Sequence, residues 1–365
     1  MEISVKKEDI VSALNTTLGV VEKRQTLPIL ANVLFEVDKK SFKLTATDLE
    51  SEVTTSGSLL NIDSAGKTTT SAKKLNELCR LIPDGEEINL ILNGDKLNIK
   101  TKNGKYSLST LPSSDFPIFD IDSGDSPLII PAKDLQELIK NTSFAMGNQD
   151  WRHYLNGLYL SINNKEITAV TTDAHRLAVA NLSTQSDHSF SGIIPRKSIN
   201  EMAKFLSDEG GDAELKINNA SLELTVGNLV FKSKLIDGKF PDYQQVIPSG
   251  ESSLLEINVR DFSETLSRVS VLSSEKYKGI RLITSADGVR ILANNPEQEE
   301  AEEFFPATYS GEDIDIAFNV TYLQEIMSHM QTDICHINFF GSDKSCLLTP
   351  PGSDSPKYVV MPLLV

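Results

Sequence analysis

One short segment, Thr171–Leu177 with the sequence TTDAHRL, holds the residue types best suited to chemistry. An Asp and a His two positions apart are able to bind a metal ion or transfer protons, and an Arg beside them binds anions. A metal site needs at least three protein ligands, and this segment supplies only two. We therefore expect no metal ion here, and a metal-dependent hydrolase that uses Asp173 and His175 is a minor alternative.

The rest of the sequence shows no catalytic pattern. It contains no Gly-x-Ser-x-Gly, no His-Glu-x-x-His, no Walker loop and no dinucleotide-binding glycine fingerprint. Carboxylates are numerous, but no pair is set apart for acid–base work. These observations favour a binding protein without a cofactor over an enzyme.

Composition narrows the class of protein. The chain has 365 residues, 39% of them hydrophobic, which is typical of a soluble protein of two or three domains. It has no apolar run of the ~18 residues that cross a bilayer, no signal core at its start and no Cys-x-x-Cys pair. We expect a cytoplasmic protein with reduced thiols that contacts no membrane. The net charge of −16 argues against non-specific adhesion to nucleic acid but is compatible with a local basic surface.

The elements that must position the segment recur along the chain. A strand followed by a helix is predicted at 3–14, 128–139 and 255–266. A second amphipathic helix then returns with a period of about 124 residues, because apolar residues repeat at i, i+3, i+4 and i+7. The three apolar stripes are Leu75, Leu78, Cys79 and Ile82; Ile199, Met202, Ala203 and Leu206; and Leu323, Ile326, Met327 and Met330. The expected helix starts are Ser71, Pro195 and Asn319.

Short strands with hairpin turns, at 93–96 and 218–220 for example, surround these helices. The predicted fold class is therefore α+β, with three similar domains in tandem, each containing two helices and antiparallel sheets. Loop-like segments place the domains at 1–125, 126–250 and 251–365.

The segment itself belongs to the repeat. Thr47-Asp48 and Asn294-Asn295 follow similar apolar runs in the first and third copies. The Thr-Asp half is thus expected to be structural, whereas His175-Arg176-Leu177 distinguishes the middle copy. We interpret that half as part of a docking groove and not as an active site.

Two of the second helices carry basic pairs in one register, Lys73 with Arg80 and Lys197 with Lys204. Each pair lies opposite the apolar stripe, and the third helix is uncharged at these positions. A solvated face would explain one such helix. Two of them inside an acidic protein favour a surface that binds phosphates without reading base sequence. Residues that would extend this surface are Arg24, Lys140 and Arg268.

The segment 149–154 is predicted to be a loop because Gly and Asn flank it. It contains the only Trp of the chain, Trp151, with Arg, His and Tyr beside it. Packing in a core and contact with nucleic acid explain this composition equally well.

The two ends of the chain carry opposite charges. An acidic run occupies 297–303, and the first copy has Lys73, Lys74, Lys102 and Lys105 near an apolar set. A solvated surface would explain the acidic run. Complementary ends also favour head-to-tail self-association, which either closes a ring or propagates.

Seven motifs distributed over all three copies carry a family resemblance. They are TLPILAN at 26–32, TDLE at 47–50, LSTLP at 108–112, TDAHRLA at 172–178, DGKFPDY at 237–243, NNPEQEEAEE at 294–303 and YVVMP at 358–362. Together they resemble the bacterial DNA sliding clamp family, the beta subunit of DNA polymerase III. The resemblance implies a DNA clamp fold in a head-to-tail homodimer, a ring of six domains with helices inside and sheets outside.

Such a ring encircles double-stranded DNA, has no reaction of its own and tethers a polymerase, which raises processivity. The implied partners are the catalytic subunit of the replicative DNA polymerase, the clamp loader complex, and other clamp-binding polymerases and repair proteins. The alternative from another class is a peptide-binding scaffold that never meets DNA. Retention on circular but not on linear DNA would distinguish the two.

The resemblance also assigns residues by position. The implied DNA contacts are Arg24, Lys73, Gln149, Arg152, His153 and Tyr154, and the basic register adds Lys197. The implied dimer interface joins Lys74, Leu78, Ile82, Lys105 and Tyr106 to Val271, Leu272, Glu297, Glu300 and Glu303. The implied peptide-binding groove comprises Leu155, Thr172, Ala174, His175, Arg176, Leu177, Pro241, Val246, Tyr277, Asn319, Tyr322, Ser345, Val359, Val360, Met361, Pro362 and Leu363. Exposed ion pairs contribute only ~0–1 kcal/mol, so apolar residues should dominate the dimer interface.

Overall fold

The computed structural model describes residues 1–21, 27–38, 40–119, 127–163, 165–208 and 210–363. They form two compact units, and each is described by itself. The first comprises Met1–Gln136 with Asn200–Leu235, and the second comprises Glu137–Ile199 with Ile236–Val365. No helix within the described ranges is long and apolar enough to cross a membrane.

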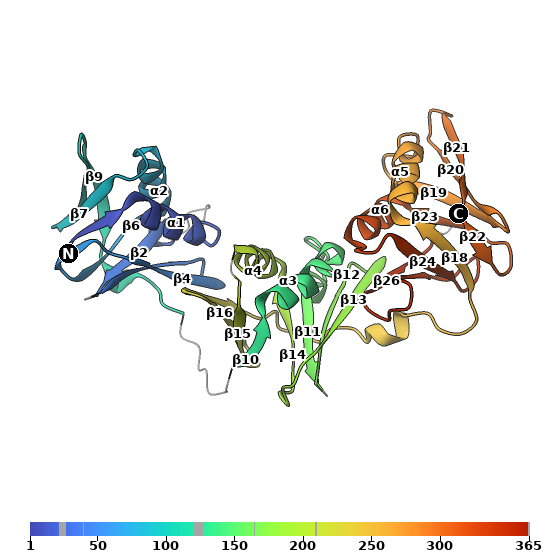
Figure 1. The fold of residues 1–365 in the computed structure, drawn as a ribbon, viewed down its shortest axis with the longest axis horizontal. Helices are drawn as coiled ribbons and strands as arrows, with labels where there is room; N and C mark the ends of the chain where they lie inside the picture. The colour runs from blue at the N-terminus through green and yellow to red at the C-terminus, as the bar shows by residue number, and fades with distance from the viewer. Residues whose placement is uncertain (22–26, 39, 120–126, 164, 209, 364–365) are drawn as a thin grey trace. The chain divides into compact units, whose positions relative to one another are not determined.

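The first unit is built on a 13-stranded sheet with the order β10-β15-β16-β17-β4-β3-β2-β6-β9-β8-β7-β1-β5. Its helices α1 (Lys7–Thr17) and α2 (Ala72–Leu81) lie side by side (Figure 1). Its strands are β1 (Glu2–Lys6), β2 (Asn32–Val37), β3 (Ser41–Thr47), β4 (Ser51–Ser58), β5 (Asn61–Ser64), β6 (Gly66–Ser71), β7 (Glu87–Asn93), β8 (Lys96–Lys100), β9 (Lys105–Leu111), β10 (Leu128–Pro131), β15 (Asp212–Ile217), β16 (Ser221–Val226) and β17 (Leu229–Lys234). Short 3-10 turns are η1 (Pro28–Ala31) and η2 (Ser113–Asp115).

The second unit holds a nine-stranded sheet, β14-β11-β12-β13-β26-β25-β24-β18-β22, and a four-stranded sheet, β21-β20-β19-β23. Its helices are α5 (Val259–Ser270) and α6 (Val320–His329), with 3-10 turns η3 (Ser143–Ala145), η4 (His153–Leu155) and η5 (Tyr243–Val246). Its strands are β11 (Gly157–Asn163), β12 (Glu166–Thr172), β13 (Arg176–Ser183), β14 (Phe190–Pro195), β18 (Ser253–Asn258), β19 (Gly279–Ser285), β20 (Gly288–Asn294), β21 (Glu300–Pro306), β22 (Thr308–Ser310), β23 (Asp315–Asn319), β24 (Ile334–Phe339), β25 (Cys346–Thr349) and β26 (Lys357–Val360). Helices α3 (Ala132–Lys140) and α4 (Arg196–Asp208) each contribute residues to both units.

The element order confirms the predicted threefold repeat. Each copy reads strand, helix, four or five strands, helix and three strands, starting at β1, β10 and β18. The strands of each copy pair antiparallel, as in the hairpins β7–β8, β15–β16 and β19–β20. The predicted α+β class, with two helices in each of three tandem domains, is therefore correct.

The second helix of each copy starts where the sequence indicates. The side chain of Ser71 accepts a hydrogen bond from the backbone N–H of Lys74 and begins α2, and Asn319 caps α6 through the N–H of Thr321. The start of α4 differs from the prediction by one residue. Pro195 is the last residue of β14, and α4 begins at Arg196. A proline is tolerated there because β14 is an edge strand, which does not need every N–H group for pairing.

The sheets continue from one copy into the next. Strand β17 of the middle copy pairs with β4 of the first copy over Leu229–Ser233. Strand β13 of the middle copy pairs with β26 of the third copy over Arg176–Val179. These two pairings divide the middle copy between the two units, which the periodicity of the sequence did not predict.

The domain boundaries stay predictions. The one near residue 125 lies outside the described residues. The one near residue 250 falls in the connection between η5 and β18.

Candidate functional site

The segment Thr171–Leu177 forms the turn between β12 and β13. The Oγ1 of Thr172 donates to the carbonyl oxygen of Arg176 at 2.6 Å and accepts from the N–H of Ala174 at 3.0 Å. The Oδ1 of Asp173 accepts from the N–H groups of His175 and Arg176, each at 3.0 Å. Ala174 takes the left-handed conformation with φ of 73°. The side chain of Asp173 thus accepts the hydrogen bonds that a backbone carbonyl oxygen would accept in an ordinary turn.

The first copy builds the same turn with its own Thr-Asp pair, Thr47 and Asp48. Thr47 donates to the carbonyl oxygen of Ser51 at 2.8 Å, and Asp48 accepts from the N–H groups of Glu50 and Ser51 at 3.0 and 2.6 Å. Leu49 has φ of 75°, which matches Ala174. The Thr-Asp half of the segment is thus structural, as predicted.

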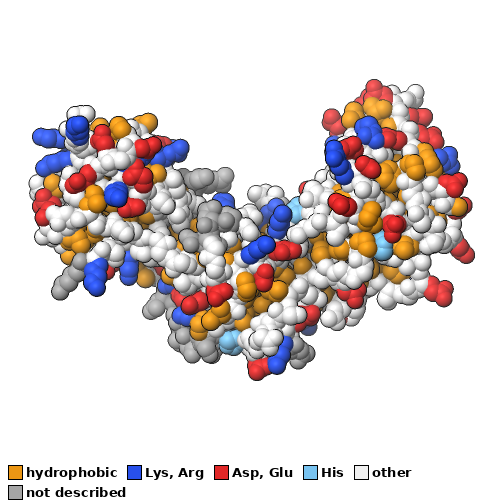
Figure 2. Space-filling view, viewed as in Figure 1, with side chains coloured by type: hydrophobic (Ala, Val, Ile, Leu, Met, Phe, Trp, Pro, Cys, Tyr) orange, Lys and Arg blue, Asp and Glu red, His pale blue; other side chains and the backbone are white. Residues whose placement is uncertain are grey.

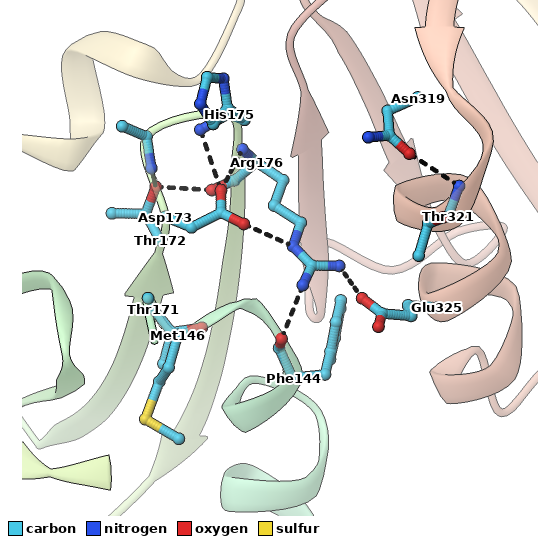
Figure 3. Close-up of polar contacts among 12 residues, drawn as sticks. Phe144, Met146, Thr171, Thr172, Asp173, His175, Arg176, Asn319, Thr321 and Glu325 are labelled. Atoms are coloured by element: carbon cyan, nitrogen blue, oxygen red, sulfur yellow. Dashed lines mark hydrogen bonds and ion pairs between the residues drawn. The ribbon is translucent and has the colours of Figure 1, made fainter. Parts of the chain in front are cut away.

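Arg176 is held by partners on three sides (Figure 3). Its Nε donates to Asp173 at 3.1 Å, its Nη2 donates to the carbonyl oxygen of Phe144 at 2.9 Å, and its Nη1 forms an ion pair with Glu325 of α6. The guanidinium carbon also lies 4.7 Å from the ring centroid of Tyr322. Arg176 is only 8% exposed, so it ties the turn to α6 and does not present its charge to a ligand.

This arrangement removes the support for a metal-dependent hydrolase. Both carboxylate oxygens of Asp173 are already bonded, Oδ1 to the turn and Oδ2 to Arg176. Within the described ranges, no group of three His, Cys, Asp or Glu side chains is close enough to hold a metal ion.

Strand β26 lies beside the turn and faces two cores. Its Val359 packs with Leu177, Val179 and Phe240, whereas Val360 belongs to the core of the C-terminal copy. After the strand, the N–H of Met361 donates to the carbonyl oxygen of His175 at 2.9 Å. Neighbouring side chains of a strand point to opposite faces, and here both faces are filled.

The predicted groove residues therefore separate into two layers. Leu155, Leu177, Val359 and Val360 are at most 2% exposed, and Arg176 is buried beside them, so they support the surface from below. The other twelve are half-buried or exposed, and we call them the docking face. They are Thr172, Ala174, His175, Pro241, Val246, Tyr277, Asn319, Tyr322, Ser345, Met361, Pro362 and Leu363.

Several contacts bring members of the docking face together. The rings of His175 and Tyr322 stack with centroids 6.4 Å apart, and Tyr322 is on the helix that Asn319 caps. The N–H of Leu363 donates to the carbonyl oxygen of Ala317 at 2.8 Å, which fixes the chain after β26 against β23. Burial raises the pKa of Tyr322 above its ordinary value, because loss of solvation disfavours the phenolate.

The loop 149–154 is tied together by hydrogen bonds around Asp150. Its carboxylate accepts from Nε and Nη2 of Arg152 at 3.0 and 2.9 Å, and from the N–H of the same residue at 2.8 Å. The sequence left open whether Trp151 packs in a core. It does not, because this residue is 82% exposed on the loop. Gln149 and His153 are exposed as well, whereas Tyr154 packs against the cluster under β26.

The pairing in this loop gives a titration prediction. The hydrogen bond from Arg152 lowers the pKa of Asp150 from an ordinary 3.8 to about 2. A carboxyl with a lowered pKa stabilises the loop above pH 3.8, and that contribution is lost as pH falls through about 2. Carbon-13 NMR of the carboxyl should show Asp150 still ionised at about pH 3, and Arg152→Gln should return its pKa toward 3.8. An unchanged pKa in that variant would contradict the pairing.

The basic helix faces carry less unpaired charge than the sequence suggests. Lys73, Arg80, Lys197 and Lys204 are all exposed, as predicted. The Nζ of Lys73 lies 3.8 Å from the Oε1 of Glu77, and the Nζ of Lys204 lies 2.7 Å from the Oε1 of Glu201. Arg268 forms an ion pair with Glu303, and Arg24 lies outside the described residues.

The residues predicted for a dimer interface lie on or next to α2 and β9 in the first unit and α5 and β21 in the second. Tyr106 is on β9 and is 43% exposed, and Val271 directly follows α5 and is 76% exposed. Acidic side chains gather over the β20–β21 hairpin (Figure 2). Glu303, however, already accepts hydrogen bonds from Arg268 and Thr265 within the chain.

Leu81 is a surface residue that the sequence reasoning missed. The helical stripe pointed to Ile82, but α2 ends at Leu81 and Ile82 is extended and only 6% exposed. Leu81 is 84% exposed, and Leu78 one turn earlier is half-buried. The sequence did offer a signal for an exposed apolar residue here, because Leu81 is a leucine outside the predicted buried stripe.

Burial of the thiols gives a second prediction. Cys79, Cys335 and Cys346 are buried, and loss of solvation raises the pKa of Cys79 and of Cys335 to about 12. At pH 8 roughly one such thiol in ten thousand is ionised, so a disulfide reagent should find no reactive thiol in the native protein. Denaturant should release all three. Rapid reaction of one thiol without denaturant would show that its strand or helix opens.

Comparison with known proteins decides the family. Residues 1–120, 129–242 and 244–364 match the N-terminal, central and C-terminal domains of the DNA polymerase III beta subunit. The beta sliding clamp of Pseudomonas putida is 39% identical over 365 residues, with all of both chains covered. This chain belongs to the beta sliding clamp family.

Solved structures of family members share the fold. The crystal structure of the DNA polymerase III subunit beta from Pseudomonas aeruginosa superposes with a TM-score of 0.97, at 38% identity over all of both chains. A sliding clamp from the same organism bound to griselimycin gives the same values. The three tandem domains inferred from the repeat are thus the three domains of a beta sliding clamp.

Proposed function

We propose that this chain is a DNA polymerase processivity factor, a ring-shaped homodimer that encircles duplex DNA and tethers the replicative polymerase. The match to beta sliding clamps over the whole chain, at 39% identity, carries the proposal. The ring has no catalytic role and needs no cofactor, and it works in the cytoplasm. It raises processivity because a tethered polymerase that lets go of its primer rebinds in an effectively intramolecular step.

Two open sheet edges support a head-to-tail dimer. Strand β21 is the last strand of its sheet, and β9 meets β6 only at Thr110 and Leu111, so the Lys105 end of β9 is also an edge. Edge strands pair readily with strands of another chain. Lys105 on one edge and Glu300 on the other add charge complementarity, and Leu81, Tyr106 and Val271 supply the apolar contact.

The DNA-binding proposal rests on two exposed lysines and on one loop with polar and cationic side chains, which we propose contact phosphates and not base edges. Lys73 and Lys197 come from equivalent helices, and Gln149, Arg152, His153 and Tyr154 come from the loop before β11. Binding through phosphates is strong but independent of sequence, which a sliding ring requires.

The docking face is proposed to bind short peptide segments of partner proteins. Met361 and Tyr277 are exposed, and Tyr322 and Val246 are half-buried. Val246 packs against the apolar cluster that contains Val359 of β26. Flexible apolar side chains, Met above all, accept Leu or Phe anchors from several partners. We infer that the partners are the polymerase catalytic subunit, the clamp loader complex, and other clamp-binding polymerases and repair proteins.

A retention assay tests the proposal. The purified protein, loaded by its clamp loader, should stay on nicked circular duplex DNA through a gel-filtration column and should be lost after linearisation. A topological ring slides off free ends, whereas a peptide-binding scaffold elutes without DNA in both cases. Equal retention on circular and linear DNA would refute encirclement.

A further inference from the structure

Trp151 is an exposed aromatic side chain that the fold does not use. It is 82% exposed and is the only Trp of the chain. Large aromatic side chains are usually buried, because leaving their apolar surface in water costs free energy. A Trp that folding leaves largely in water is a candidate for binding.

Hydrogen bonds fix the backbone of the loop that carries this ring before any ligand arrives. The N–H of Asp150 donates to Oδ1 of Asn156 at 2.9 Å, and the amide of Asn156 donates back to the carbonyl oxygen of Asp150 at 2.8 Å. At the base of the loop, the N–H of Gly147 donates to the carbonyl oxygen of Leu155 at 2.9 Å. A preorganised loop loses little conformational entropy on binding.

Arg152 places one cation beside the ring, which favours an anionic partner. The guanidinium carbon of Arg152 lies 5.7 Å from the ring centroid, and Asp150 occupies only two of its five N–H donors. Arg196 donates to the carbonyl oxygens of Met146 and Gly147 at 2.8 and 3.2 Å, which joins the loop to the start of α4. The next residue, Lys197, is exposed.

We propose that Trp151 stacks on an unpaired nucleobase of single-stranded DNA next to the duplex in the ring. A ring face combined with cations suits a base and its phosphate. In an intact duplex the base faces are covered by their neighbours, so phosphate contacts alone would leave the indole without a partner. This inference rests on the proposed function, and it adds a preference for the junction between single- and double-stranded DNA.

The fluorescence of the wild-type dimer provides the first test, because Trp151 is the only tryptophan. A primer–template with a single-stranded thymidine overhang should quench and shift the emission and protect it from acrylamide. A blunt duplex of equal phosphate content should not. The same response to both DNAs, or a response only to added polymerase, would overturn the inference and in the latter case identify a protein contact.

Variants provide the second test, with labelled DNA and fluorescence anisotropy. Trp151→Ala should lower the ratio of junction affinity to blunt-duplex affinity roughly five-fold, and Trp151→Phe should lower it less. Ile129→Ala, at an apolar residue of β10 that is 58% exposed, should leave the ratio unchanged. An unchanged ratio in Trp151→Ala contradicts stacking. Retention of the wild-type protein on circular duplex DNA tests encirclement separately. The stacking proposal can therefore fail while the ring proposal holds, and the reverse is also true.

Discussion

Replacing Val271 by Asp should convert a dimer of about 80 kDa into a monomer of 40.2 kDa. Val271 is 76% exposed in the single chain and is proposed to be covered in the dimer. Burying a carboxylate without a partner costs several kcal/mol, so we expect the dimer dissociation constant to rise by roughly a thousand-fold. Native mass spectrometry or sedimentation over a concentration series would measure the change, and retention on circular DNA should be lost with it.

Two further variants make this test specific. Ile118→Asp places the same charge at an apolar residue that is 69% exposed but is not assigned to the interface, and it should remain dimeric. Leu81→Asp, on the opposite edge, should be monomeric like Val271→Asp. In a head-to-tail arrangement a mixture of the two monomers regains one intact contact and forms an open dimer. Failure of the mixture to associate would contradict the head-to-tail arrangement.

Replacing Arg176 by Ala should destabilise the second unit by about 3 kcal/mol. Arg176 is 8% exposed, and its truncation leaves the carbonyl oxygen of Phe144 and the Oδ2 of Asp173 without a donor and Glu325 without its cation. The midpoint of urea unfolding should fall, and binding of partner peptides should weaken because the turn and α6 are no longer joined.

Arg281→Ala is the matched control. Arg281 also pairs with a carboxylate through two nitrogens, that of Asp315, but the two side chains are 55% and 46% exposed. An exposed pair contributes less than about 1 kcal/mol. Arg176→Lys keeps the charge without the forked donors and should lie between the two. Equal midpoints for Arg176→Ala and Arg281→Ala would show that the buried cluster adds no stability.

Much of the fold can be predicted from the sequence, because each helix shows a characteristic spacing of apolar residues within its own segment. Leu75 and Cys79 belong to a stripe with helical spacing, and the copies at Ile199 and Leu323 are buried to the same degree. The Thr-Asp turns were also predictable, since an Asp that bonds to the backbone two and three residues later acts within its own turn. Such features need no information about distant residues.

The continuation of the sheets and the burial of Arg176 were not predictable in this way. A strand such as β17 carries the same alternation whether its neighbour is solvent or β4, so the partner is not written in the strand itself. Arg176 likewise finds Glu325 far along the chain, and an arginine beside a turn is most often solvated. The position of Leu81 depended on a helix ending one residue earlier than its apolar stripe.

The shared sheets also limit how this chain can be divided. A protein engineer who excised the middle copy would cut β17 away from β4 and β13 away from β26, and would expose two rows of unpaired backbone groups. Open edges of that kind promote aggregation and domain swapping. The copies therefore repeat the same order of elements but do not fold as independent modules. A truncated clamp would need new edge-blocking residues, such as lysine or proline, to remain monomeric.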